Sequence, residues 1–113
     1  MALIASQQIL ETGKTATLSS ASASDTFTNS GKEFLFVKNE NGSSINVTVT
    51  VEVSSVDISS FGTLTKSNTV FAVANGAEAF LGTFPPGAYN GDNAIVTFAC
   101  SATENVKVAI LYL

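Results

Sequence analysis

The sequence contains no His, no Arg and no Trp, and it has a single Cys among 113 residues. Most reaction chemistry near neutral pH uses an imidazole, a guanidinium, a thiolate or paired carboxylates. Five lysines and nine acidic residues carry all the side-chain charge, and they are scattered singly along the chain. We therefore expect the protein not to be an enzyme, and we expect no catalytic residues, no cofactor and no bound metal ion.

The scarcity of positive charge also bears on partners. The formal net charge is −4, whereas phosphate binding requires clustered cations. The lysines are isolated from one another, so we expect no nucleic-acid partner. No apolar run approaches the roughly 18 residues that would span a bilayer, so we expect no membrane partner either. The apolar start of the chain has no basic segment before it, which argues against a secretory signal and for synthesis in the cytoplasm.

Cys100 has no partner for a disulfide within the chain. It follows the strand-like run Val96–Ala99 and has no His to activate it, so we interpret it as a small buried hydrophobic residue. The absence of a disulfide framework favours a reducing compartment.

Other polar and aromatic residues have two possible interpretations. Asn90–Asn93 offers oxygen atoms that Ca²⁺ would accept, but one Asp supplies fewer carboxylates than such a site usually has, so turn chemistry is favoured. The nine acidic residues show no spacing that pairs them, and we expect solvated charges. Phe61, Tyr89 and Tyr112 resemble a sugar-stacking platform, although core or assembly contacts fit better where Trp is absent.

Ser and Thr, 27 residues in all, alternate with Val, Ile and Phe in a pattern typical of β-strands. Residues 45–53 alternate strictly and predict a half-buried antiparallel strand, whereas residues 33–38 are apolar on both faces and predict a strand covered on both sides. Further strands are expected at 69–74, 78–83, 94–101 and 106–112, with the last two forming a hairpin and the final one central or clamped by a partner. Residues 54–68 are expected to be a long connection with room for one short strand, and 84–93 a loop, because two prolines cannot donate to a ladder.

About seven or eight short strands without any helical period predict an all-β protein, a single antiparallel β-sandwich of jelly-roll type. Residues 15–113 would form this domain, and residues 1–14 an N-terminal arm or a first strand. The weakly charged surface and the high apolar content indicate self-association, as a dimer or a trimer.

Two motifs add a family resemblance. They are D-x-F-x-N-x-G at Asp25–Gly31 and F-P-P-x-x-Y-N at Phe84–Asn90. With the alternating strand between them and two apolar strands after them, residues 25–113 resemble small virion proteins of tailed bacteriophages, some of which decorate or cement the capsid.

The resemblance implies a structural protein that is made in the host cytoplasm and binds the outer capsid surface of the virion, where it bridges subunits of the major capsid protein. The alternative is a phage tail or fibre-associated binding module that recognises a receptor or a carbohydrate. We expect the arm to add a strand to a capsid subunit, so that deleting residues 2–12 abolishes binding. The candidate partner-binding residues are the apolar residues of the arm and of two loops: Leu3, Ile4, Ile9, Leu10, Phe61, Phe84, Pro85, Pro86 and Tyr89.

Overall fold

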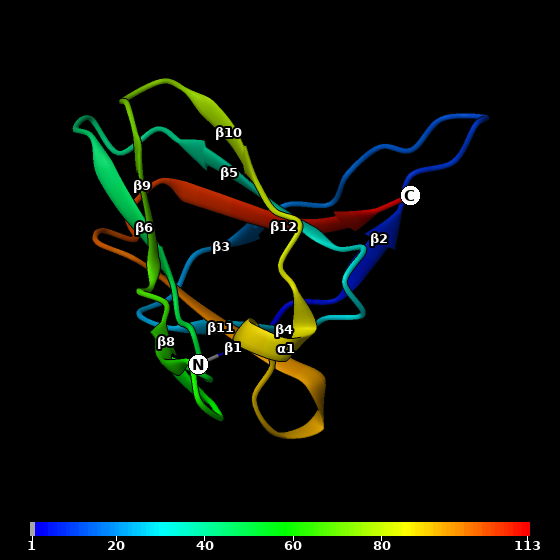
Figure 1. The fold of residues 1–113 in the computed structure, drawn as a ribbon. Coiled ribbons are helices and arrows are strands. Elements are labelled where there is room, and N and C mark those ends of the chain that lie inside the picture. The colour runs from blue at the N-terminus through cyan, green and yellow to red at the C-terminus, as the bar shows by residue number, and fades with distance from the viewer. Residues whose placement is uncertain (1) are drawn as a thin grey trace.

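The computed structural model describes residues 2–113 and is mostly β (Figure 1). Met1, which the predicted arm included, lies outside the described residues. The first sheet has five strands, in the spatial order β1 (Ala2–Leu3), β4 (Asp25–Thr28), β11 (Ile95–Cys100), β6 (Ile45–Val49) and β9 (Thr69–Val73). The second sheet has the order β10 (Glu78–Leu81), β5 (Phe34–Asn39), β12 (Val106–Tyr112) and β2 (Ser6–Gln8), with β3 (Ser19–Ser20) also paired to β12. A separate hairpin consists of β7 (Ser55–Ile58) and β8 (Gly62–Thr65).

The predicted β-rich class is confirmed, but the expectation of purely antiparallel pairing is wrong. β1 runs parallel to β4, and β2 runs parallel to β12. Parallel neighbours require a long crossover connection, which the chain between each pair of strands provides. Residues 2–8 thereby pair with both sheets of their own chain.

A hydrophobic core draws on both sheets. Phe27, Phe98 and Val47 come from the first sheet, and Leu35 and Val108 come from the second; all five are fully buried in one cluster. Every second side chain along these strands faces the core, because successive side chains of a strand point to opposite faces, and most of these inward side chains are apolar. The core therefore follows the alternation that is visible in the sequence.

β12 is the central strand of the second sheet and is buried on both faces, as the sequence predicted for a central strand. Val106, Val108 and Ile110 face the main core. On its other face, Ala109 and Leu111 pack with Phe36 of β5 in a smaller cluster. Ala16 and Phe34 add to this cluster, so the segment before β3 covers part of the outer face of the sheet. Both faces of β5 are covered in the same way, which confirms the prediction for residues 33–38.

The expected hairpin between the last two strands is wrong. β11 pairs with β4 and β6, whereas β12 pairs with β5, β2 and β3. The turn at 102–105 therefore passes the chain from one sheet to the other. Each strand has a fully apolar inner face, so each can cover the core from its own sheet instead of pairing with the other.

Two connections differ from the prediction as well. The segment 84–93 was expected to be a loop, but it contains the short helix α1 (Pro86–Tyr89) and the 3₁₀ turn η1 (Asp92–Ala94). Proline fits the first turn of a helix, because the N–H group that it lacks would have no helical partner there.

The segment 54–68 forms two strands rather than one. The strand predicted at 45–53 ends at Val49, and beyond it the side chain of Asn68 accepts the N–H of Val51 at 2.9 Å. Neither helix within residues 2–113 has the length or apolarity to cross a membrane.

Candidate interaction surfaces

The two motifs of the sequence meet in one buried junction. Asn29 directly follows β4, and its Nδ2 donates to the carbonyl oxygen of Phe84 at 2.9 Å and to Oδ1 of Asn90 at 2.8 Å. Asn90 in turn donates from Nδ2 to the carbonyl oxygen of Asn29 at 3.0 Å. Because buried amides must be hydrogen-bonded, these contacts fix the loop of the second motif against the first.

Aromatic packing strengthens the same junction. The ring of Phe84 lies 5.9 Å from that of Phe27 and 5.3 Å from that of Tyr89, measured between centroids. Gly31 has a φ of +95°, and a Cβ at this position would lie 3.4 Å from the ring of Pro86. This separation is an ordinary van der Waals contact, so glycine is favoured here by its positive φ, which it adopts without steric cost. The motif residues therefore support the fold.

Tyr89 also fixes the beginning of β9. Its hydroxyl lies 2.5 Å from Oγ1 of Thr69, and Nζ of Lys66 lies 5.4 Å from the centre of its ring. A cation over an aromatic face is attracted by the negative charge density of the ring. The short helix and the start of β9 are thus held together by one side chain.

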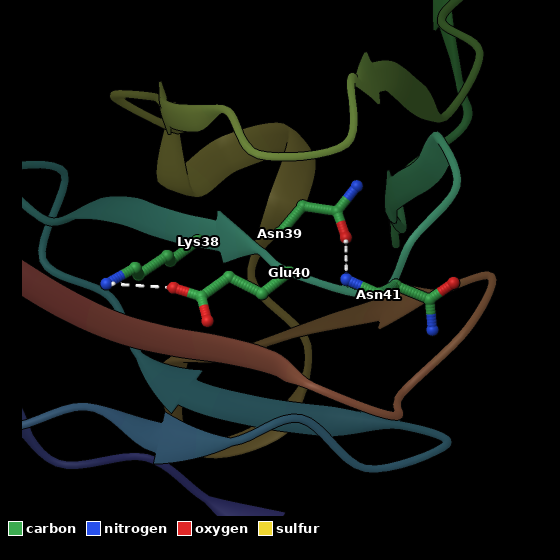
Figure 2. Close-up of polar contacts among 4 residues, drawn as sticks. All are labelled: Lys38, Asn39, Glu40 and Asn41. Carbon is green, nitrogen blue, oxygen red and sulfur yellow. Dashed lines mark hydrogen bonds and ion pairs between the residues drawn. The ribbon is translucent and has the colours of Figure 1, made fainter.

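Asn39 performs a similar role at the far end of β9. It is fully buried, and its Nδ2 donates to the carbonyl oxygens of Ser43 at 2.9 Å and Val73 at 3.0 Å. Its Oδ1 accepts the N–H of Asn41 at 2.9 Å, and beside it Lys38 and Glu40 form an ion pair at 3.1 Å (Figure 2). The hydrogen bond between Glu40 and Lys38, together with the charge of Glu40, raises the pKa of the Lys38 ammonium. Because Val73 is held here and Thr69 at Tyr89, β9 is fixed at both ends.

The structure places the predicted contact residues in two groups. Ile4, Phe84 and Tyr89 are buried in the main core, so their side chains are not available on the surface of a single chain. The others are exposed at the surface, namely Leu3, Ile9, Leu10, Phe61, Pro85 and Pro86.

The β7–β8 hairpin presents an apolar surface, of which only Phe61 was predicted from the sequence. The register pairs Val56 with Leu64 and Ile58 with Gly62, so the apolar side chains share one face. On the opposite face, Oγ1 of Thr63 donates to Asp57 at 2.5 Å. All of the hairpin is exposed, with Leu64 at 62% and Phe61 in the turn at 86%. The alternation of Val56, Ile58 and Leu64 was the available signal, but each run is too short to distinguish a strand from a loop.

Two grooves border these elements. One of about 270 Å³ separates the base of the hairpin from α1, with Val53, Val56, Leu64 and Ala88 as its apolar walls. The other, of about 300 Å³, lies between β9 and β10. It is lined by Thr69, Val70, Phe71, Phe80, Leu81, Gly82, Thr83, Phe84 and Tyr89.

Two buried titratable groups, Cys100 and Glu33, have pKa values shifted by their surroundings. Burial, reinforced by the negative charge of Asp25, raises the pKa of the Cys100 thiol to about 11. For Glu33, burial favours the protonated form, but hydrogen bonds from the N–H and hydroxyl groups of Ser30 outweigh it and lower the pKa. Among residues 2–113, no three His, Cys, Asp or Glu side chains are grouped so that they could share a metal ion.

Comparison of this chain with protein families, with curated proteins and with solved structures found no match.

Proposed function

We propose that this protein is a structural virion component that binds the outer surface of a tailed-phage capsid and bridges subunits of its major capsid protein. It would be made in the host cytoplasm and act in the assembled particle. The observation that carries the proposal is the β7–β8 hairpin, whose apolar face is exposed. The two motifs that resemble phage virion proteins add support, because they meet in one junction that positions α1 beside this hairpin.

An isolated two-stranded hairpin is marginally stable in water, and an apolar side chain gains free energy when a partner covers it. Within residues 2–113, β7 and β8 pair only with each other, and the side chains of Val56, Ile58 and Leu64 are exposed. Contiguous exposed apolar side chains mark interaction sites on soluble proteins. We infer that the hairpin and the groove at its base dock onto a capsid subunit.

Docking through the hairpin replaces docking through an arm in this proposal. β1 and β2 pair with β4 and β12 of their own chain, so residues 2–8 have their ladder partners within the molecule. A decorating protein binds many equivalent positions on one shell, so each contact can lie near the low end of the roughly 1,200–2,000 Å² that stable interfaces bury.

We further infer that the two sheets are the layers of a β-sandwich of jelly-roll type. The support is that one hydrophobic cluster takes side chains from β4, β6 and β11 of the first sheet and from β5 and β12 of the second. The chain also changes sheet at the turn between β11 and β12, as it does between the layers of such folds.

The test is co-sedimentation of the purified protein with capsid shells that lack it. The wild-type chain should bind saturably at a fixed ratio to the major capsid protein, and Phe61→Ser combined with Leu64→Ser should weaken binding at least about tenfold. Leu113→Ser is the matched control, because Leu113 is 79% exposed and lies outside the hairpin. Equal binding by the hairpin variant and the control would refute docking through the hairpin.

Absence of wild-type binding to shells, with the protein recovered in tail fractions, would instead support the alternative of a tail or fibre-associated binding module. Phe61 would then be the first residue to test against receptor glycans, because an exposed ring in a turn is suited to sugar stacking.

A further inference from the structure

β9 is an open edge of the first sheet. β6 pairs with one side of it, and no strand in the described part of the chain, residues 2–113, pairs with the other. Half of the backbone N–H and C=O groups of an antiparallel edge strand point away from its neighbour. β9 therefore offers a row of main-chain donors and acceptors that another strand can use.

The other sheet edges have features that discourage pairing, and β9 does not. Natural proteins protect edges by making the strands short or by placing charges on them. β1 and β3 have two residues each, β2 has three, and β10 begins with Glu78. β9 has five residues, and the stretch 67–77 around it contains no charged side chain.

The side chains of β9 are also incompletely covered. Every second residue of β9 lies on the inner face of the sheet, namely Thr69, Phe71 and Val73. Val73 is fully buried, whereas Phe71 remains 46% exposed. Its ring borders the groove between β9 and β10. Val70, on the opposite face, is 60% exposed. Because Tyr89 and Asn39 fix the two ends of β9, this edge is held in place.

We propose that β9 pairs in antiparallel orientation with β9 of a second copy of this chain, about a two-fold axis at Phe71. In this register Phe71 lies opposite Phe71 of the partner subunit, and Val70 lies opposite Ala72 of the partner subunit. Each first sheet of five strands would continue into that of the other copy.

A second copy fits this edge for a reason of charge. A two-fold axis places each residue near its own equivalent, so any charge at the centre would face a like charge. The uncharged stretch 67–77 avoids this repulsion, and an aromatic pair at the axis adds favourable packing. This self-association is independent of the capsid, so its failure would leave the proposed function standing.

The mass of the protein in solution tests the pairing, measured by sedimentation equilibrium at about 100 µM. The wild-type chain of 11.7 kDa should sediment as a dimer of twice that mass. Phe71→Lys places two like charges at the axis and should raise the dissociation constant at least about tenfold. Leu113→Lys is the control, because Leu113 is 79% exposed and follows β12 of the second sheet, outside the β9 edge and its groove, so this variant should remain dimeric.

A crosslink tests the register with a variant that adds no charge. Directly opposed residues of an antiparallel pair have Cα atoms about 4.5–5.5 Å apart, within the range that a disulfide spans. In a Cys100→Ala background, Phe71→Cys should form a covalent dimer on mild oxidation, whereas Leu113→Cys, at an exposed position outside the β9 edge, should not. Far-UV circular dichroism confirms that each variant is folded.

A wild-type monomer at this concentration would overturn the proposal, as would loss of the dimer in both lysine variants. If the wild-type chain is monomeric and its β9 amides are protected from hydrogen exchange only when capsid shells are present, the edge pairs with a strand of the shell instead.

Discussion

Asn29 and Asn90 hold each other through two reciprocal hydrogen bonds, although 61 residues separate them in the chain. One lies directly after β4, and the other directly after α1. The pair therefore links a strand end of the first sheet to the proline loop and thereby positions Tyr89. Through Tyr89 the junction reaches β9, which is the edge proposed for self-association.

Replacement of Asn29 by Ala should destabilise the protein by about 2–3 kcal/mol, because it leaves the buried carbonyl oxygen of Phe84 and the partly buried N–H of Gly31 without their partner. Urea unfolding followed by circular dichroism measures this free energy, and the slope with denaturant should not change. Asn46→Ala, at an exposed position of β6, is the control and should cost less than about 0.5 kcal/mol. Equal losses in the two variants would contradict the role of the junction.

The hydroxyl of Tyr89 should contribute to stability only through Thr69. Tyr89→Phe keeps the ring against Phe84 and removes one hydrogen bond, with an expected cost of about 1 kcal/mol. Thr69→Val should cost a similar amount, and the double variant should cost about as much as either single one. Additive losses would show that the two side chains act separately. Hydrogen exchange should also accelerate at the first amides of β9 in all three variants.

The Cys100 thiol should be unreactive in the folded protein. Its pKa of about 11, against an ordinary value of 9.0, lowers the thiolate fraction near pH 8 about 100-fold, and burial hinders access further. Alkylation by iodoacetamide should therefore be at least about 100-fold slower in buffer than in urea. Thr103→Cys in a Cys100→Ala background, at an exposed turn, should react at similar rates in both solvents.

Glu33 should make stability depend on pH in the acid range. Its pKa is lower in the folded protein than the ordinary value of 4.5, so folding favours the carboxylate. The stabilisation is present above about pH 4.5 and is lost as the pH falls through the folded-state pKa. Glu33→Gln should be less stable than wild type at pH 7, and the difference should shrink on acidification.

Ser30→Ala provides the complementary variant for this group. It removes the hydroxyl donor but leaves the N–H that donates to Glu33 at 2.6 Å, so it should show part of the same pH-dependent loss. A difference between wild type and Glu33→Gln that is constant from pH 7 to pH 3 would contradict the assignment to the carboxylate.

The strands that alternate cleanly could be predicted from the sequence, and their partners could not. Ile45, Val47 and Val49 revealed β6 because period-2 patterning is a local property. The inner faces of β11 and β12 are equally apolar, and such faces suit strands of one hairpin as well as strands of two separate sheets. Only contacts distant in the chain, such as β11 with β4, decide between the two arrangements.

Some candidate contact residues are buried and others exposed, again because contacts distant in the chain decide burial. Phe84 and Tyr89 lie beside two prolines, a composition typical of an exposed loop, but Asn29 holds that loop over the core. Phe61 was predicted as a contact residue because it lies within a polar connection, and it is exposed. The polar neighbours of an apolar residue such as Phe61 therefore predict its exposure from the local sequence. The burial of Phe84 could not be predicted locally, because it depends on a hydrogen bond from Asn29, 55 residues away.

The central position of β12 has a consequence for how the chain folds during synthesis. β5, β2 and β3 all pair with β12, so three strands made early on the ribosome remain without their common partner until residue 112 has emerged. Nascent chains with unpaired strands are prone to associate wrongly. Because β5 also pairs with β12, the second sheet should be complete only after residues 106–112 have been translated.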